Sequence, residues 1–379
     1  STAYGSVASV FDGKAFATSG GYLNALDPFT GALIWRTRLA YGGSGPTKID
    51  DTYLFVDSTY GEAVYRISDG AYVSNINFTG GSVYTNQPGT ADYFPGRFSN
   101  ETKMKFRGIT NADTYENWII AIDLSDPTNP REAWRYLCDE NSVLLALGDG
   151  KAFIGTFQGT VYALDQRNGT LLWKAPKIGM TNTYSATYYN GKLYQGCSTT
   201  RLTCYDGDTG EILWDYDAGE GRAFFSYGGA AAYGRVYFHN IDPYGGFIGC
   251  WDAETGEILW KTPAYYYIAY VTPIIADGKY YEMRSDGTPV AGRAAQPVSF
   301  SCLDAFTGEI LWEIPQTWST PLIAYVNLYA GTFTGTVCLG SPKPAKPWSM
   351  WRGNLDQSGV AANQSGPSNF SKGPRWTFK

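Results

Sequence analysis

The chain has 379 residues and a formal net charge of −6 at neutral pH. An acidic chain offers no positive field to attract a polyanion, so nucleic acid is not an expected partner. No run approaches the roughly 18 apolar residues of a membrane-spanning helix, so no transmembrane segment is expected. Aromatic residues make up 16% of the sequence and glycine occurs 45 times, which is typical of a strand-rich fold with many turns.

The first clear element lies at 26–35, which reads Leu-Asp-Pro-Phe-Thr-Gly-Ala-Leu-Ile-Trp. The Asp can accept backbone N–H bonds at the start of a turn, and the Gly supplies the positive φ that closes it. An apolar strand ending in Trp35 follows. Near-identical phrases recur at 164–173, 205–214, 251–260 and 303–312.

A degenerate copy of this repeat follows at 62–73, with Val73 in the position of the Trp. We interpret 80–117 as a long insert, which contains Tyr-Phe-Pro-Gly-Arg at 93–97 and is a possible interaction surface. The next copy runs from Trp118 through a Pro-containing turn to Trp134.

Residues 150–165 align without gaps on 191–206, and each segment predicts a hairpin. We place a two-residue turn at Gln158-Gly159, which makes Cys197 face Leu202 in the second hairpin. Each hairpin, the strand that ends in Trp and one further strand form a four-stranded meander. Such a unit repeated every 40 to 60 residues is typical of a propeller blade (about 40–50 residues per blade).

The last copy begins at 322–340, passes through a Pro-, Gly- and Ser-rich excursion at about 341–375, and ends in a strand with Trp376. The sequence therefore predicts an all-β fold, a single eight-bladed propeller domain over 1–379, with seven blades as the alternative. Each Trp is expected to pack on the next blade and to donate its N–H to a backbone acceptor. The predicted blade-docking residues are Trp35, Trp134, Trp173, Trp214, Trp260, Trp312 and Trp376.

The Ala-Leu-Asp-x-x-Thr-Gly-x-x-x-Trp phrase resembles the tryptophan-docking repeat of the PQQ-like, or quinoprotein alcohol dehydrogenase-like, propeller family. The resemblance covers essentially the whole chain and implies the fold. The stretch at 348–359 resembles the segment that usually precedes the first blade in this family, so the chain reads as a circular permutation. The family includes enzymes that hold pyrroloquinoline quinone and Ca²⁺, and non-catalytic members such as a bacterial outer-membrane assembly lipoprotein, so the fold alone does not choose the function.

The features that the resemblance associates with quinone chemistry are missing from the sequence. A quinone dehydrogenase needs oxygen ligands for Ca²⁺, an Asp base, a cation and an aromatic floor, and it usually shows two adjacent cysteines. No Cys-Cys pair occurs here. We therefore predict no cofactor and no catalytic residue, and keep PQQ with Ca²⁺ as the alternative.

The cysteines and the single histidine have structural interpretations. Cys204, Cys250, Cys302 and Cys338 occupy the column that holds Ala elsewhere, so we expect them, with Cys197, to be buried thiols. The pairing state of Cys138 is left open. His239 is expected to be a surface or satisfied loop residue, with a metal or acid–base role as the alternative.

The loops that join the outer strand of one blade to the inner strand of the next crowd one face of a propeller, and here they are rich in aromatic residues. Tyr, Trp and Arg often anchor ligands and partners, so this face is the predicted binding face. The alternative is that the Tyr run packs between blades. The candidate binding residues are Arg222, Tyr265, Tyr266, Tyr267 and Trp318.

The chain starts at Ser1 without a charged-then-apolar leader, which fits processing or the removal of a signal peptide. Its Asn-x-Ser/Thr sequons are about twice as frequent as chance predicts, with chance as the alternative. We therefore expect a secreted glycoprotein in an extracellular, cell-surface or periplasm-like location. The candidate glycosylation sites are Asn77, Asn100, Asn168, Asn363 and Asn369.

These observations favour a non-catalytic binding or scaffold propeller that recognises a protein or glycan partner. A PQQ- and Ca²⁺-dependent dehydrogenase is the first alternative. The second is a structural subunit of a surface layer or extracellular filament, which would self-assemble.

Overall fold

The computed structural model of the chain describes residues 6–41, 43, 45–57, 61–76, 83–84, 97–111, 114–140, 142–176, 186–196, 200–219, 229–240, 246–264, 273–284, 299–314, 322–324, 327–332, 335–340 and 376–378. The regular structure of these residues consists of β-strands, arranged in eight antiparallel sheets. Each sheet contains consecutive strands of the chain, so we call it a blade and number the blades in chain order.

Blades 1 to 4 comprise the following strands. Blade 1 contains β1 (Ser6–Phe11), β2 (Lys14–Ser19), β3 (Tyr22–Leu26) and β4 (Leu33–Arg38). Blade 2 contains β5 (Pro46–Lys48), β6 (Tyr53–Val56), β7 (Glu62–Arg66) and β8 (Tyr72–Ile76). Blade 3 contains β10 (Arg97–Ser99), β11 (Met104–Asn111), β12 (Asn117–Asp123) and β13 (Arg131–Cys138), and β9 (Val83–Tyr84) pairs with β11. Blade 4 contains β14 (Ser142–Gly148), β15 (Lys151–Thr156), β16 (Val161–Asp165) and β17 (Leu171–Lys174).

Blades 5 to 8 repeat this plan. Blade 5 contains β18 (Ala186–Tyr189), β19 (Lys192–Gly196), β20 (Arg201–Asp206) and β21 (Ile212–Asp217). Blade 6 contains β22 (Ala230–Ala232), β23 (Arg235–Asn240), β24 (Phe247–Asp252) and β25 (Ile258–Pro263). Blade 7 contains β26 (Ile274–Ala276), β27 (Lys279–Arg284), β28 (Ser299–Asp304) and β29 (Ile310–Ile314). Blade 8 contains β30 (Leu322–Ala324), β31 (Asn327–Thr332), β32 (Gly335–Gly340) and β33 (Trp376–Phe378).

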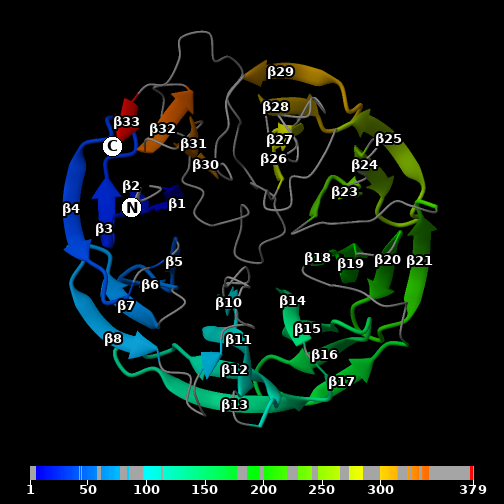
Figure 1. The fold of residues 1–379 in the computed structure, drawn as a ribbon, viewed down its shortest axis with the longest axis horizontal. Coiled ribbons are helices and arrows are strands. Elements are labelled where there is room, and N and C mark those ends of the chain that lie inside the picture. Colours follow the sequence, from blue (N-terminus) through cyan, green and yellow to red (C-terminus); the bar gives the residue numbers. More distant parts are fainter. Residues whose placement is uncertain are drawn as a thin grey trace.

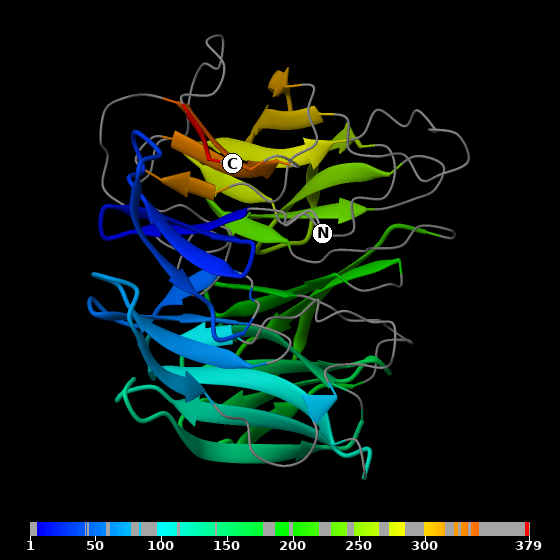
Figure 2. The ribbon, with the colours of Figure 1, turned by 60° about the vertical axis from the view of Figure 1, so that its left-hand side comes forward.

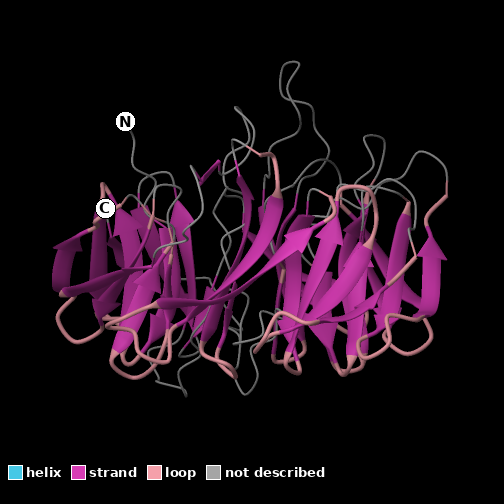
Figure 3. Cartoon of the chain, turned by 90° about the horizontal axis from the view of Figure 1, so that it is seen from below, coloured by secondary structure: helices cyan, strands magenta, loops and turns pink. Residues whose placement is uncertain are grey.

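The blades form a closed ring, with the first strand of each blade toward the axis and the fourth on the rim (Figure 1). Viewed from the edge, the ring is a disc, and the strands of its blades run across the thickness of the disc (Figure 3). The eight-bladed prediction is confirmed, and the seven-bladed alternative is wrong. Blades 1 and 8 lie side by side (Figures 1 and 2), and the Tyr329 hydroxyl of blade 8 donates to the Pro28 carbonyl of blade 1 over 3.0 Å. The ring therefore closes by side-chain contact between two complete blades.

A row of three side chains crosses each blade from its second to its fourth strand. In blade 1 the row is Phe16, Ala25 and Trp35, which are directly paired in the sheet. The outer two members are aromatic, with ring centroids 5.7 to 6.0 Å apart in six blades. A small residue must lie between them, because a larger side chain would overlap the two rings.

In blades 1, 3, 4, 5 and 6 the Trp of the row contacts the next blade, and we call this contact the tryptophan clamp. Trp173 of blade 4 lies against Gly210 of blade 5 and donates its indole N–H to the Gly207 carbonyl over 3.0 Å. Equivalent bonds of 2.9 to 3.1 Å join Trp35 to Ile67, Trp134 to Gln166, Trp214 to Ala253 and Trp260 to Ala305. The recurrent Thr-Gly turn therefore combines a positive φ with a surface flat enough to receive an indole.

Blade 2 departs from the predicted register at the clamp position. Val64 pairs with Ser74, at the point where Ala25 pairs with Trp35 in blade 1. The prediction that Val73 replaces the Trp is wrong, because the Trp of the other repeats follows its turn Gly by four residues, and Ser74 is the residue four positions after Gly70. Ser74 occupies the clamp position and donates to the Pro127 carbonyl of blade 3 over 2.7 Å.

Two further expectations need correction. Residues 97–111 lie within the predicted insert, yet they form β10 and β11, the two inner strands of blade 3. The hairpin turn at 157–159 has three residues, since the Thr156 N–H donates to the Thr160 carbonyl. The second hairpin consequently pairs Gly196 with Leu202. Cys197, expected opposite Leu202, lies outside the described residues.

The clamp predicts a specific cost for a methyl group at Gly210. Its φ is +73°, and an added Cβ would lie 2.4 Å from Trp173 Cε3. Gly191 has a φ of +75° and nothing within 4 Å of its Cβ position, so Gly191→Ala measures backbone strain alone. We expect Gly191→Ala to lower the free energy of unfolding by about 1–2 kcal/mol and Gly210→Ala by about 2–5 kcal/mol in urea titrations. Equal losses would contradict the clamp.

Candidate functional site

The predicted binding face falls on connections outside the described residues. β21 leads to β22, β25 to β26 and β29 to β30, so all three connections leave the rim strand of one blade for the axial strand of the next. These connections carry Arg222, Tyr265, Tyr266, Tyr267 and Trp318, and the binding face remains a prediction. The sequons at Asn77, Asn363 and Asn369 and the side chains of Cys338 and Trp376 also lie outside the described part of the chain.

Two polar clusters lie between blades in the part that the structure describes. The first, between blades 2 and 3, we call the charge quartet: Asp57, Glu62, Lys105 and Arg107. Lys105 Nζ lies 2.6 Å from Asp57 Oδ1 and 3.3 Å from Glu62 Oε2, and Arg107 Nη1 lies 2.8 Å from Glu62 Oε1. These four side chains are at most 10% exposed, so two cations and two carboxylates are buried together.

Burial dominates the electrostatics of the quartet. It raises the pKa of Glu62 to about 7, although the positive charge of Lys105 opposes the shift. The Lys105 ammonium also lies 4.3 Å from the centre of the Phe55 ring, a favourable cation–π contact. The junction thus places two cations beside two carboxylates, and the raised pKa leaves the Glu62 carboxyl partly protonated near neutral pH.

The second cluster lies between blades 6 and 7 and consists of His239, Tyr280 and Glu282. His239 Nδ1 contacts Glu282 Oε1, and the Tyr280 hydroxyl donates to Glu282 Oε2. Burial lowers the pKa of His239 to about 4 and raises the pKa of Glu282 well above its usual range. Both shifts favour a neutral chain in which the Glu282 carboxyl donates to the His239 imidazole. His239 is therefore a buried strand residue, and the expectation of a surface loop histidine is wrong.

The two clusters occupy equivalent positions. On the first blade of each junction, Asp57 or His239 lies two residues after the aromatic member of the three-residue row. On the second blade, the other cluster residues lie directly beside the aromatic member of the row. Lys105 and Arg107 flank Phe106, and Tyr280 and Glu282 flank Tyr281. The junctions are four blades apart and thus lie on opposite sides of the ring (Figure 1). The sequence holds a signal for these clusters, because charged residues alternate with the row aromatic in a strand that should be buried. We missed it by interpreting 80–117 as an insert.

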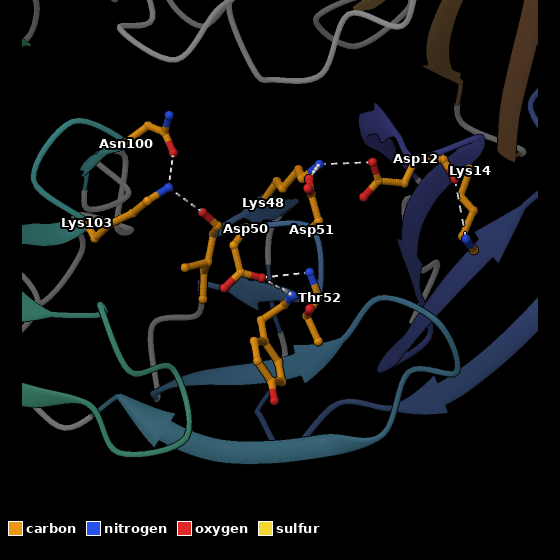
Figure 4. Close-up of polar contacts among 10 residues, drawn as sticks. Asp12, Lys14, Lys48, Asp50, Asp51, Thr52, Asn100 and Lys103 are labelled. Atoms are coloured by element: carbon orange, nitrogen blue, oxygen red, sulfur yellow. Dashed lines mark hydrogen bonds and ion pairs between the residues drawn. The ribbon is translucent and has the colours of Figure 1, made fainter.

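A third polar group joins the turns of blades 1 to 3 (Figure 4). Lys48 Nζ lies 2.9 Å from Asp12 Oδ1 and 2.7 Å from Asp51 Oδ1, and Lys103 donates to the Ile49 carbonyl over 3.1 Å and to Asn100. Asp51 is 97% exposed at its side chain, so this group lies at the surface. These contacts tie adjacent blades and use the donor capacity of both lysines.

The cysteines of blades 5 to 7 lie in the middle of the three-residue rows. Cys204, Cys250 and Cys302 are free and buried, and Cys138 is free and buried as well. Burial raises the pKa of each of the three row thiols to about 12. Thiols with so high a pKa are poor nucleophiles and metal ligands, so these three are packing residues.

The described residues contain no group of three or more His, Cys, Asp or Glu side chains that could hold a metal ion. No helix in the described ranges is long and apolar enough to cross a membrane.

Comparisons with known proteins agree with this architecture. The family model described as outer membrane protein assembly factor BamB matches residues 157–242. Quinohemoprotein alcohol dehydrogenase ADH IIB of Pseudomonas putida is 24% identical over a region that covers 29% of this chain. These two matches support a PQQ-like propeller repeat. The match spans only 20% of the length of that enzyme, a fifth of the curated relative.

Solved structures show the same fold. The computationally designed protein Ika8 has a TM-score of 0.66 at 15% identity, covering 88% of this PQQ-like propeller and 95% of the designed chain. BamB from Moraxella catarrhalis has a TM-score of 0.59 at 15% identity over 88% and 98% of the two chains. Quinohemoprotein alcohol dehydrogenase ADHIIG from Pseudomonas putida HK5 has a TM-score of 0.57 at 13% identity over 86% and 70%.

The neutral His239–Glu282 contact predicts that Glu282→Gln stabilises the protein at high pH. Because the pKa of Glu282 is raised in the folded state, its contribution to stability is present at low pH and is lost as pH rises. A glutamine keeps the neutral form at every pH. We expect urea titrations to show a gain of about 1–2 kcal/mol at pH 8 and little change at pH 5.

Glu313→Gln is the matched control on the same blade. Glu313 Oε1 accepts from Arg284 Nε over 2.7 Å, so this change should lower stability at pH 8. A loss of stability at pH 8 in Glu282→Gln would show that the pair is ionised.

Proposed function

We propose that this chain is a non-catalytic binding or scaffold propeller, exported from the cytoplasm, that recognises a protein or glycan partner through the loops between rim and axial strands. The observation that carries this proposal is that the three polar groups described above contact neighbouring blades. The charge quartet, the His239 cluster and the turn lysines all make contacts between blades. Binding is then assigned to the aromatic loops that the sequence places on one face.

The comparisons add support from the names of the similar proteins. One model, which matches residues 157–242, is described as an outer membrane protein assembly factor, and we take this name as support for an assembly role. An eight-bladed ring suits this role, because it displays loops from every blade on one rigid disc. A location outside the cytoplasm is part of the same proposal.

The binding face can be tested by substitution. We expect Arg222→Ala with Trp318→Ala to reduce capture of a partner from an envelope fraction at least tenfold, measured by cross-linking and mass spectrometry. Arg167→Ala is the control, because Arg167 lies exposed on the turn of blade 4 and pairs with Glu101 at 3.2 Å. Equal losses in both proteins would contradict the assignment of the face, and self-association of the purified chain would identify a second copy as the partner.

A PQQ- and Ca²⁺-dependent dehydrogenase is the second candidate, favoured by the identity to the alcohol dehydrogenase ADH IIB. Adding PQQ and Ca²⁺ to the purified chain separates the two candidates. Our proposal expects no change in melting temperature and no dye-linked alcohol oxidation. A stoichiometric quinone absorbance that survives gel filtration would overturn it.

Export also predicts which described sequon carries a glycan. Asn168 is exposed, and its Oδ1 accepts the Thr170 N–H over 2.9 Å, which leaves Nδ2 available. Asn100 is half-buried and its Oδ1 accepts from Lys103. When the full chain is secreted from eukaryotic cells, we expect peptide mass spectrometry after enzymatic deglycosylation in H₂¹⁸O to mark Asn168 and leave Asn100 unmarked. The reverse pattern would contradict this prediction.

A further inference from the structure

The junction between blades 2 and 3 lacks the tryptophan clamp. Ser74 stands in the clamp position and makes one hydrogen bond, to the Pro127 carbonyl. The receiving turn of blade 3 reads Ser-Asp-Pro-Thr-Asn-Pro at 125–130 and has no Gly to receive an indole. The five other junctions with described contacts at this position, 1/2, 3/4, 4/5, 5/6 and 6/7, each have a hydrogen-bonded Trp.

The same junction contains the charge quartet. Asp57 and Glu62 come from blade 2, and Lys105 and Arg107 come from blade 3, so its three ion pairs all cross the junction. A further polar contact crosses nearby, where Lys103 donates to the Ile49 carbonyl (Figure 4). An apolar cluster that includes Val64 and Ile120 fills the remaining interior. Buried charges thus replace the aromatic clamp here.

The two kinds of junction respond differently to opening. Opening a clamped junction exposes an indole and its acceptor to water. The stabilisation from burying the apolar ring is lost, and hydration does not compensate for it. Opening the quartet separates ion pairs but restores the hydration of four charged groups, which offsets much of the loss. A junction held by charges is therefore closed in the native state and costs less to open than its clamped neighbours.

We infer that, among the six junctions whose clamp position the structure describes, the junction between blades 2 and 3 opens first, and we call it the charge-locked seam. The inference rests on the missing clamp and on the buried quartet. It does not depend on the proposed binding function. The seam is therefore a point of local opening within the part of the ring that the structure describes.

The chain supplies its own probes for testing the seam. Cys204 and Cys250 occupy the middle of the rows at junctions 5/6 and 6/7, both clamped. Val64 holds the same position in blade 2 and is fully buried. Val64→Cys therefore places a thiol at the seam, and Ala163→Cys places one at clamped junction 4/5 as a matched control.

The experiment measures alkylation of the native full-length variants by N-ethylmaleimide, with each cysteine followed by peptide mass spectrometry. We expect the thiol introduced at position 64 to react at least tenfold faster than Cys204 and Cys250 in the same molecule. The thiol introduced at position 163 should react at their slow rate. Equal or slower labelling at position 64 would overturn the inference.

A charge substitution distinguishes the contribution of the charge quartet to seam opening from that of the missing Trp. Glu62→Gln, added to Val64→Cys, should increase labelling at position 64 by a further tenfold and leave Cys204 unchanged. Lys174→Gln, which breaks an exposed pair with Asp139, should change neither rate. If these variants do not fold, hydrogen exchange of the unaltered chain decides: the seam strands β7 and β11 must exchange faster than β16 and β20.

Discussion

The structure depends on one contact repeated around the ring, the indole of one blade lying on the turn glycine of the next. The contact buries a large apolar ring, satisfies its N–H with a backbone carbonyl, and requires a residue without a Cβ beneath it. It also fixes the interior, because the paired aromatic and indole leave room only for Ala or Cys between them. The contact with the neighbouring blade thus stabilises each blade that has it. The hydrogen bond from blade 8 to blade 1 closes the ring.

The departures from this contact are informative. Blade 2 has Ser74 where the Trp belongs, and its junction contains four buried charges. Blades 6 and 7 keep the clamp and add a neutral His–Glu–Tyr chain at the equivalent position on the opposite side of the ring. The buried polar groups of these two junctions therefore join neighbouring blades.

Most of the fold could be predicted from the sequence, because the Asp-x-x-Thr-Gly turn and its Trp are local patterns with a fixed spacing. The errors arose where local pattern was weakest. Val73 was placed in the clamp position although the other repeats place the Trp four residues after the turn Gly, a spacing that gives Ser74 after Gly70. β10 and β11 were missed because charged Lys105 and Arg107 look like surface residues. The pairing of His239 with Glu282 could not be predicted, since it joins strands 43 positions apart through burial and not through a motif.

The indole N–H protons report the clamp directly. In a ¹H–¹⁵N correlation spectrum of the deuterated protein, assigned by single Trp→Phe variants, the account predicts that the indole N–H protons of Trp35, Trp134, Trp173, Trp214 and Trp260 exchange slowly with solvent. Their protection should approach that of the central strand amides. Exchange of these five indoles at the rate of exposed tryptophan would contradict the clamp and the account built on it.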